Sequence, residues 1–190
     1  MTQLSVNEIE SKVREKYGNS KRLTHILGVA QLAKRLALIF NLDENKAYVA
    51  GLLHDYYKYE PISEMVELIN DEQIVEKFKS APQIYHAYAS CVAAKEEFNI
   101  TDSEILNAIK YHVYGRLNMS LFEKILVISD FAEDSREYPQ CKEVRKILDE
   151  GKFDLAMYLC IKYTIEAVLE KGATPMEEQY EILKQLEEKL

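Results

Sequence analysis

The chain has no tryptophan, only 6 glycines and 4 prolines among 190 residues, and no repeat, low-complexity tract or proline-rich linker. It therefore shows no composition typical of a disordered or fibrous protein. No run approaches the ~18 uncharged apolar residues that a transmembrane helix requires. The N-terminal stretch MTQLSVNEIESKVREKYG also lacks the basic start and apolar core of a signal peptide. We therefore expect a cytoplasmic protein that binds no membrane.

Cysteine is scarce and widely spaced. The three cysteines, Cys91, Cys141 and Cys160, form no CxxC pair. An odd number of isolated cysteines indicates neither a disulfide framework nor a thiolate zinc site. We expect reduced thiols packed in the core.

Basic residues are fewer than acidic ones: the chain has 24 Lys and Arg and 32 Asp and Glu, which gives a net charge of −8. This balance excludes binding to nucleic acid or anionic membranes through a broad basic surface. An acidic protein can still bind a small polyanion if metal ions and a few cations concentrate positive charge in one cleft.

The fold that the sequence predicts is all-α. No sustained alternation of apolar and polar residues occurs, whereas apolar residues recur at helical spacing throughout. Four capping boxes predict helix starts, at Ser5 with Glu8, Thr101 with Glu104, Ser120 with Glu123, and Thr174 with Glu177, where Pro175 takes the first helical position. Later helices are expected over 83–98, 102–113, 121–132, 140–150, 154–171 and 175–189. With no clear boundary, we expect one domain over 1–190, in which the helices of 154–189 form a C-terminal extension.

Two early stripes of small and apolar residues predict a close helix pair. They comprise Leu23, Ile26, Ala30, Ala33 and Ala37 in one helix, and Ala47, Ala50, Gly51 and His54 in the next. Small side chains let two helices approach closely. The sequence therefore places His54 inside a bundle.

All four histidines lie in predicted helices or at their ends: His25, His54, His86 and His112. A single helical histidine is more often a packed, hydrogen-bonded core residue than a metal ligand. Four of them on four helices favour a metal site, because helical bundles build such sites from facing helices. Asp130 interrupts the apolar run KILVISDFA, where an unpaired carboxylate is costly to bury, although it could instead be solvated at a helix end.

The order H…HD…H…H…D resembles the ligand set of the HD-domain metal-dependent phosphohydrolases. The similarity extends over about 20–150. The segments RLTHILGVAQLAKRLA, KAYVAGLLHDYYK, AAKEEF, ILNAIKYHVYGRLNMSLFEKI and SDFAEDSREYP narrow it to the bacterial symmetrical diadenosine-tetraphosphate hydrolases of the YqeK type. Tyr59, Ala89 and Asp134 depart from the usual residues of that group, but none is a proposed ligand.

The resemblance implies an HD-type bundle and a binuclear metal centre. His25, His54, Asp55 and Asp130 would hold one ion, and Asp55 would bridge to a second ion held by His86 and His112. Mixed imidazole and carboxylate ligands suit iron, manganese, cobalt, nickel or zinc, and the resemblance favours iron. The implied reaction is symmetrical hydrolysis of diadenosine tetraphosphate to two ADP by water that the two ions activate.

Catalytic roles are expected for Asp55, as the bridge, and for Lys58, which is one helical turn further on and can stabilise developing charge. Substrate contacts are expected from Arg22, Lys58, Gly115, Arg116 and Arg136. Arg22 and Arg116 could equally be solvated surface cations, whereas Arg136 matches a motif of the family that the chain resembles. The neighbouring tyrosines could stack on a nucleobase, although tyrosine also packs at core edges.

Two other functions stay open. Another HD enzyme, such as a nucleotidase or dNTP phosphohydrolase, would share every ligand and differ in its pocket. A non-catalytic nucleotide-binding regulator would keep the metal site without turnover. We expect a nucleotide or dinucleoside polyphosphate as partner and no nucleic acid, and a homodimer stays open.

Overall fold

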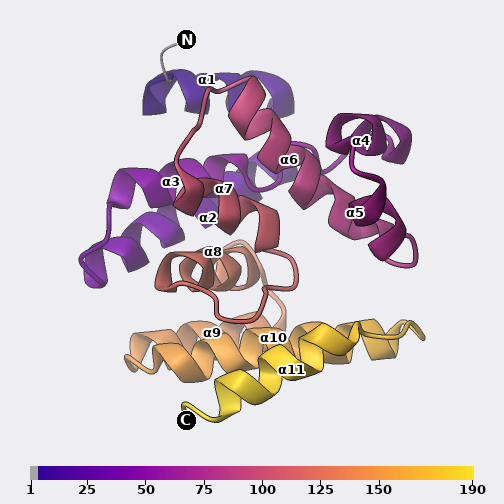
Figure 1. Cartoon of the computed structure of the whole chain (residues 1–190). Coiled ribbons are helices and arrows are strands. Elements are labelled where there is room, and N and C mark those ends of the chain that lie inside the picture. The colour runs from indigo at the N-terminus through magenta and orange to yellow at the C-terminus, as the bar shows by residue number, and fades with distance from the viewer. Residues whose placement is uncertain (1–3) are drawn as a thin grey trace.

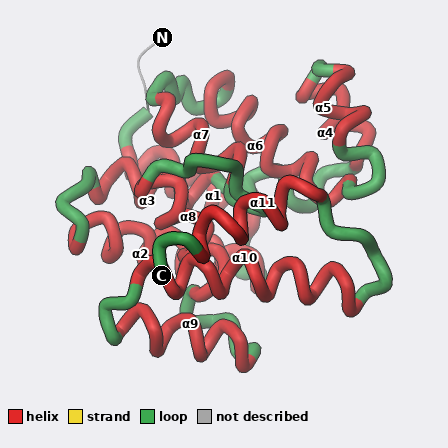
Figure 2. The backbone as a smooth tube through the Cα atoms, turned by 60° about the horizontal axis from the view of Figure 1, so that its bottom comes forward, coloured by secondary structure: helices red, strands yellow, loops and turns green. Residues whose placement is uncertain are grey.

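The computed structural model describes residues 4–190, and every regular element in them is helical (Figures 1 and 2), which confirms the all-α prediction. The α-helices are α1 (Val6–Tyr17), α2 (Lys21–Ile39), α3 (Glu44–Leu53), α4 (Ile62–Ile69), α5 (Glu72–Lys77), α6 (Tyr85–Glu96), α7 (Ser103–Tyr111), α8 (Leu121–Ala132), α9 (Pro139–Asp149), α10 (Phe153–Glu170) and α11 (Glu177–Glu187). A short 3₁₀ helix, Pro82–Ile84, precedes α6.

Two of the four predicted capping boxes are confirmed. Ser5 and Ser120 each accept the backbone N–H three residues on, and the glutamate at that position accepts the N–H of the serine. Each box thus satisfies two backbone donors that the first helical turn leaves free.

The other two predicted helix starts are wrong. Asp102, not Thr101, caps α7, and its carboxylate accepts the N–H groups of Glu104 and Ile105 in the first helical turn. A carboxylate interacts more strongly with a helix N-terminus than a hydroxyl does. Near the C-terminus, α11 begins at Glu177, so Pro175 lies before the helix.

Helices α4 and α5 were not predicted, because neither gives a long periodic run. Helix α4 spans 8 residues and α5 only 6. They are separated by Asn70, whose φ of 45° is left-handed, and by Asp71, which caps α5. Asparagine is a common C-terminal residue of this kind, so the Asn-Asp pair marks the boundary in retrospect.

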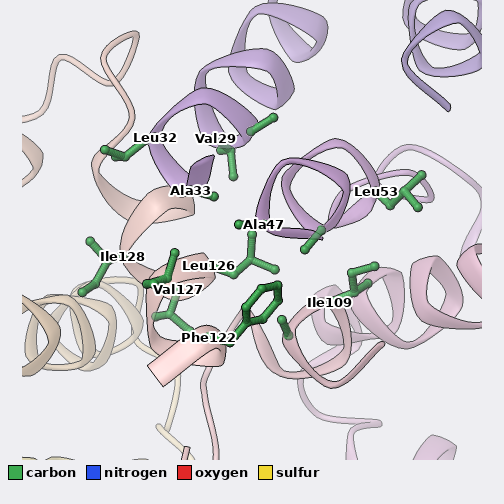
Figure 3. Close-up of a cluster of buried hydrophobic side chains, with 14 of the residues drawn as sticks. Val29, Leu32, Ala33, Ala47, Leu53, Ile109, Phe122, Leu126, Val127 and Ile128 are labelled. Atoms are coloured by element: carbon green, nitrogen blue, oxygen red, sulfur yellow. The ribbon is translucent and has the colours of Figure 1, made fainter. Parts of the chain in front are cut away.

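The predicted close packing of two small-residue stripes is confirmed for α2 and α3, which form the most extensive helix pair. A Cβ atom added at Gly51 would lie 2.8 Å from the backbone nitrogen of Ala30 and nearer still to its Cα. Figure 3 shows Val29 and Ala33 of α2 facing Ala47 of α3. This backbone contact brings the end of α3 beside the middle of α2.

Replacing Gly51 tests that contact. Gly51→Ala should lower the free energy of unfolding by about 1–3 kcal/mol, the usual cost of forcing an extra methyl group into a packed core. The opposing backbone cannot turn away as a side chain can. Thermal and urea unfolding measure the change. Gly151→Ala is unsuitable as a control, because Gly151 has a φ of 75°, which alanine adopts only with strain. The exposed helical substitution Lys12→Ala serves instead, and equal stabilities of the two variants would contradict the contact.

Helix α8 is the central element. Residues 122–129 are all buried, and Figure 1 shows α8 between α1–α7 above it and α9, α10 and α11 below it. In Figure 3 Phe122, Leu126 and Val127 of α8 meet side chains from α2, α3 and α7. Being enclosed on both sides, α8 carries Asp130 to the place where α2 and α3 meet.

Within residues 4–190, no helix has the length and apolar character needed to cross a membrane.

Candidate metal centre

The six predicted ligands come together from five helices. His25 lies inside α2, His54 and Asp55 directly follow α3, His86 is the second residue of α6, His112 follows α7, and Asp130 lies in the last turn of α8. The four imidazoles and Asp55 are buried, each with at most 7% of its surface exposed. Residues separated by more than 100 positions therefore form one cluster.

One carboxylate oxygen of Asp55 faces the first set of ligands. Asp55 Oδ2 lies 3.7 Å from His25 Nε2 and 3.5 Å from His54 Nε2. Asp130 Oδ1 completes the set at 3.0 Å from His25 Nε2 and 3.7 Å from His54 Nε2. These spacings between donor atoms suit ligands that converge on one cation.

The other oxygen of Asp55 faces a second set. Asp55 Oδ1 lies 3.0 Å from His86 Nε2 and 3.7 Å from His112 Nε2. The two Nε2 atoms are 3.3 Å apart. One buried carboxylate thus separates two pairs of imidazoles, which is the geometry of a bridging ligand.

All four imidazoles direct Nε2 into the cluster because Nδ1 is engaged outside it. His54 Nδ1 donates to the carbonyl of Gly51 at 2.7 Å, and His112 Nδ1 donates to that of Ile109 at 2.8 Å. His86 Nδ1 donates in the same way to the carbonyl of Gln83, three residues earlier. A proton held on Nδ1 leaves the lone pair of Nε2 free for a metal.

Several nitrogen and oxygen atoms of the cluster that could bind a metal ion have no hydrogen-bond partner within the described chain. They include His25 Nε2, His54 Nε2 and Asp55 Oδ1. Buried polar atoms without partners are rare and costly in proteins. Imidazole nitrogens and carboxylate oxygens in this arrangement fit divalent transition-metal ions, and three overlapping groups of these residues satisfy the spacing of such a site.

The protonation of the cluster also fits a metal site, with one exception. Burial lowers the pKa of His54 to about 3 and lowers that of His86. Burial raises the pKa of Asp55, but the adjacent imidazoles and Lys58 outweigh it and hold this pKa well below its usual value. His25 is the exception: burial lowers its pKa, yet the carboxylates of Asp130 and Glu133 beside the two ring nitrogens raise it above the ordinary value.

These opposite shifts predict how metal affinity depends on pH. As the pH falls, His25 should take a proton before His54 and His86, because its pKa is raised and theirs are lowered. That proton blocks Nε2, so affinity at the set containing His25 should fall by about tenfold per pH unit below the raised pKa. Calorimetric titration with Mn²⁺ over a pH series would measure this. Parallel loss of both binding events would contradict the assignment.

Three cationic side chains border the cluster. Arg22 pairs with Asp55 Oδ2, and Arg136 Nη2 lies 2.8 Å from Asp130 Oδ1. Lys58 Nζ is 3.1 Å from His86 Nε2 and 3.6 Å from Asp55 Oδ1. A surface pocket of about 190 Å³ opens onto the first set of ligands, and it is lined by Lys21, Arg22, His25, Tyr59, Glu133, Ser135 and Arg136. Arg22 and Arg136 therefore lie where a polyphosphate could approach the first set, and Lys58 borders the second set.

The remaining two expected substrate contacts are not brought to the cluster. Arg116 forms a bidentate ion pair with Glu123, at 2.7 and 3.1 Å. Gly115 lines a separate pocket of about 40 Å³ with Tyr111, Tyr114 and Met176, and none of the six candidate ligands lines it. The buried position of Glu123 explains the placement of Arg116, because a buried carboxylate requires a partner.

No sequence pattern indicates the groups that hold the backbone of the turn containing His54 and Asp55. The hydroxyl of Tyr17 donates to the carbonyls of Asp55 and Tyr56 at 2.8 and 3.1 Å. Ser90 Oγ accepts the N–H of Tyr57 at 3.0 Å. Tyr17 and Ser90 belong to α1 and α6, so these bonds depend on tertiary structure.

The chain is similar to several known proteins. The HD domain family matches residues 22–150. The chain is 35% identical over 152 residues to a Bacillus subtilis protein named bis(5'-nucleosyl)-tetraphosphatase, symmetrical, covering 80% of this chain and 81% of that protein. It is 33% identical over 156 residues to a Staphylococcus aureus protein of the same name, covering 81% and 80%. A crystal structure described as a predicted HD superfamily hydrolase involved in NAD metabolism, from Clostridium acetobutylicum, superposes with a TM-score of 0.90 at 34% identity and full coverage of both chains.

Proposed function

Because the chain belongs to the HD domain family, we propose that it is a metal-dependent phosphohydrolase that cleaves diadenosine tetraphosphate symmetrically into two ADP molecules. The observation that carries the proposal is Asp55, whose two buried oxygens face two separate sets of imidazoles. The names of the relatives from Bacillus subtilis and Staphylococcus aureus support the substrate and the symmetrical cleavage.

Six side chains would hold two divalent ions. The first ion would take His25, His54, Asp55 and Asp130, and the second would take Asp55, His86 and His112. Iron is the metal that we propose, and manganese, cobalt, nickel and zinc accept the same mixed nitrogen and oxygen ligands. When bound, two such ions would add about four positive charges and acidify the attacking water.

The charges of the chain itself favour a polyphosphate. With neutral imidazoles, the carboxylates of Asp55, Asp130 and Glu133 are balanced by Arg22, Lys58 and Arg136, which contact them or lie beside them. The positive charge that bound ions add is therefore not neutralised by these side chains and can attract the substrate. A dinucleoside tetraphosphate carries about four negative charges and matches that excess.

Individual residues have distinct roles in this proposal. Arg22 and Arg136 line the pocket over the first set of ligands, where their guanidinium groups can bind phosphate oxygens in a bidentate manner. Lys58 lies at the second set with 32% of its side chain exposed, so its ammonium can follow the charge that develops on the phosphates. The helices that carry Asp55, Asp130 and the four imidazoles position the oxygen and nitrogen atoms that would bind the ions.

Two alternatives differ in what they predict for substrate and turnover. A nucleotidase or dNTP phosphohydrolase would release product from mononucleotides, and a nucleotide-binding regulator would bind without turnover. Incubation of chelator-treated protein with diadenosine tetraphosphate, or with dNTPs, before and after adding Fe²⁺, Mn²⁺ or Co²⁺ separates the three. We expect metal-dependent kcat/KM to be highest for the tetraphosphate. Preference for dNTPs, or absence of turnover with every metal, would overturn the proposal.

The setting proposed for this reaction is the cytoplasm, with the dinucleoside polyphosphate as the partner and without nucleic acid. The net charge of −8 supports the last point. A homodimer stays open.

A further inference from the structure

Glu133 is a buried carboxylate beside the centre that is not one of the proposed ligands. It follows the last residue of α8, and only 1% of its surface is exposed. Its Oε1 lies 3.1 Å from Nδ1 of His25. Asp130, three residues earlier in α8, lies 3.0 Å from Nε2 of the same ring. The imidazole of His25 is therefore held between two carboxylates at the C-terminal end of α8, one at each nitrogen.

His25 needs such a partner because it is the only one of the four histidines that lies in the interior of a helix. His54, His86 and His112 lie at or beside helix ends and donate from Nδ1 to the carbonyl three residues earlier. Inside α2, backbone carbonyls already accept the N–H groups of the following turn. The Nδ1 proton of His25 is thus fixed by a residue 108 positions away.

Ser135 makes both oxygens of Glu133 acceptors. The Ser135 hydroxyl donates to Oε1 at 2.6 Å, and the Ser135 backbone N–H donates to Oε2 at 2.7 Å. A glutamine at this position would have one oxygen acceptor and one NH₂ donor. It could not accept all three bonds from Ser135 and His25, because its NH₂ group would face one of their donors. The position therefore requires a carboxylate.

Gly28 provides the space that this carboxylate occupies. It lies one turn after His25 in α2, and a Cβ atom added there would come within 3.1 Å of Glu133 Cδ and still closer to Oε2. Glycine in the middle of a helix costs about 1 kcal/mol relative to alanine. A close approach by Glu133 explains why α2 carries a glycine at this point.

Arg145 of α9 fixes the backbone of this segment. Its guanidinium donates to the carbonyls of Ala132 and Glu133 at 3.1 and 2.9 Å, and to that of Arg136 at 3.0 Å. These bonds satisfy carbonyl groups that the end of α8 leaves free. Glu133 is therefore held in its place by side chain and backbone alike.

We infer that Glu133 is a positioning residue that holds the Nδ1 proton of His25, and thereby directs Nε2 of His25 to the first ion, in a space that Gly28 leaves open. The inference rests on the proposed metal centre and is independent of the proposed substrate. Outer carboxylates of this kind typically contribute about 10–100-fold to metal affinity.

The test combines a histidine measurement with a metal titration. The chain has four histidines, so long-range ¹H–¹⁵N correlations of the metal-free protein at alkaline pH can report the tautomer of each ring. In Glu133→Gln, His25 should lose the Nδ1–H tautomer while the other three rings keep it. Titration with Zn²⁺ should show about 10–100-fold weaker binding at the His25 set and unchanged binding at the His86 and His112 set.

Two further variants keep the test decisive. Asp134→Asn changes the neighbouring exposed carboxylate and should alter neither readout. Gly28→Ala leaves Glu133 chemically intact but displaces it, so it should reproduce the effect of Glu133→Gln on His25. An unchanged His25 tautomer together with unchanged Zn²⁺ binding in Glu133→Gln would overturn the inference. If that variant does not fold, Gly28→Ala decides by the same two criteria. Neither readout depends on hydrolysis, so failure here is distinguishable from failure of the proposed function.

Discussion

Asp55→Ala should abolish hydrolysis of diadenosine tetraphosphate and release bound metal. The substitution removes both oxygens that face the two imidazole sets, at 3.5 and 3.7 Å on one side and 3.0 and 3.7 Å on the other. Neither ion would keep its bridging ligand. A centre that loses several kcal/mol of transition-state stabilisation slows by about 10³-fold or more.

Two measurements on the same sample check this prediction. Elemental analysis should give about two transition-metal ions per chain in the parent protein, the usual content of a bridged binuclear site, and a clear loss in Asp55→Ala. Turnover should fall with the metal content. Asp134→Ala is a matched control, since Asp134 is exposed and close to the site in sequence. Full metal content or near-normal kcat in Asp55→Ala would refute the bridging role, provided that circular dichroism shows the helices to be intact.

Lys58→Ala should retain the metal and lose rate. Lys58 Nζ lies 3.1 Å from His86 Nε2, but its side chain is 32% exposed and an ammonium cannot be a metal ligand. Its removal takes a positive charge from the edge of the second set without removing a donor atom. Loss of one preorganised charge-stabilising group commonly costs about 10²–10³-fold in kcat.

The separation of metal content from rate distinguishes Lys58 from the ligands. Steady-state kinetics with excess Mn²⁺ should show the loss mainly in kcat, as expected when an interaction forms only in the transition state. Lys79→Ala, which removes an exposed lysine paired only with Glu76, should behave like the parent protein. A kcat of Lys58→Ala within about twofold of the parent value would exclude a role in stabilising transition-state charge.

Features governed by local chemistry could be predicted from the sequence. The serine and glutamate of each confirmed capping box are three residues apart, so both bonds form within one turn. The small-residue stripes predicted the close pair α2 and α3, because side-chain size sets how near two helices come. The histidines could be chosen as ligands because the chain has four and places each in a helix or at its end.

Features that depend on distant segments could not be predicted. Arg116 was expected at the substrate, but it forms an ion pair with Glu123, and the burial of Glu123 depends on the helices packed around α8. The bond between Glu133 and His25 spans 108 positions, and Glu133 lies just beyond the end of α8, where helical spacing does not indicate the direction of a side chain. The hydroxyl of Tyr17 contacts the His-Asp turn only because α1 packs against α3.

The position of the oxygen atom that water adds to the product tests the central claim most directly. Hydrolysis of diadenosine tetraphosphate in H₂¹⁸O by the Mn²⁺-loaded protein, stopped early and analysed by mass spectrometry, identifies both the products and the phosphorus that water attacks. A two-ion centre that cleaves the central anhydride predicts ADP as the sole early product, with one heavy oxygen in the terminal phosphate of half of the ADP molecules. Equal amounts of ATP and AMP, with the label in either one, would contradict the account.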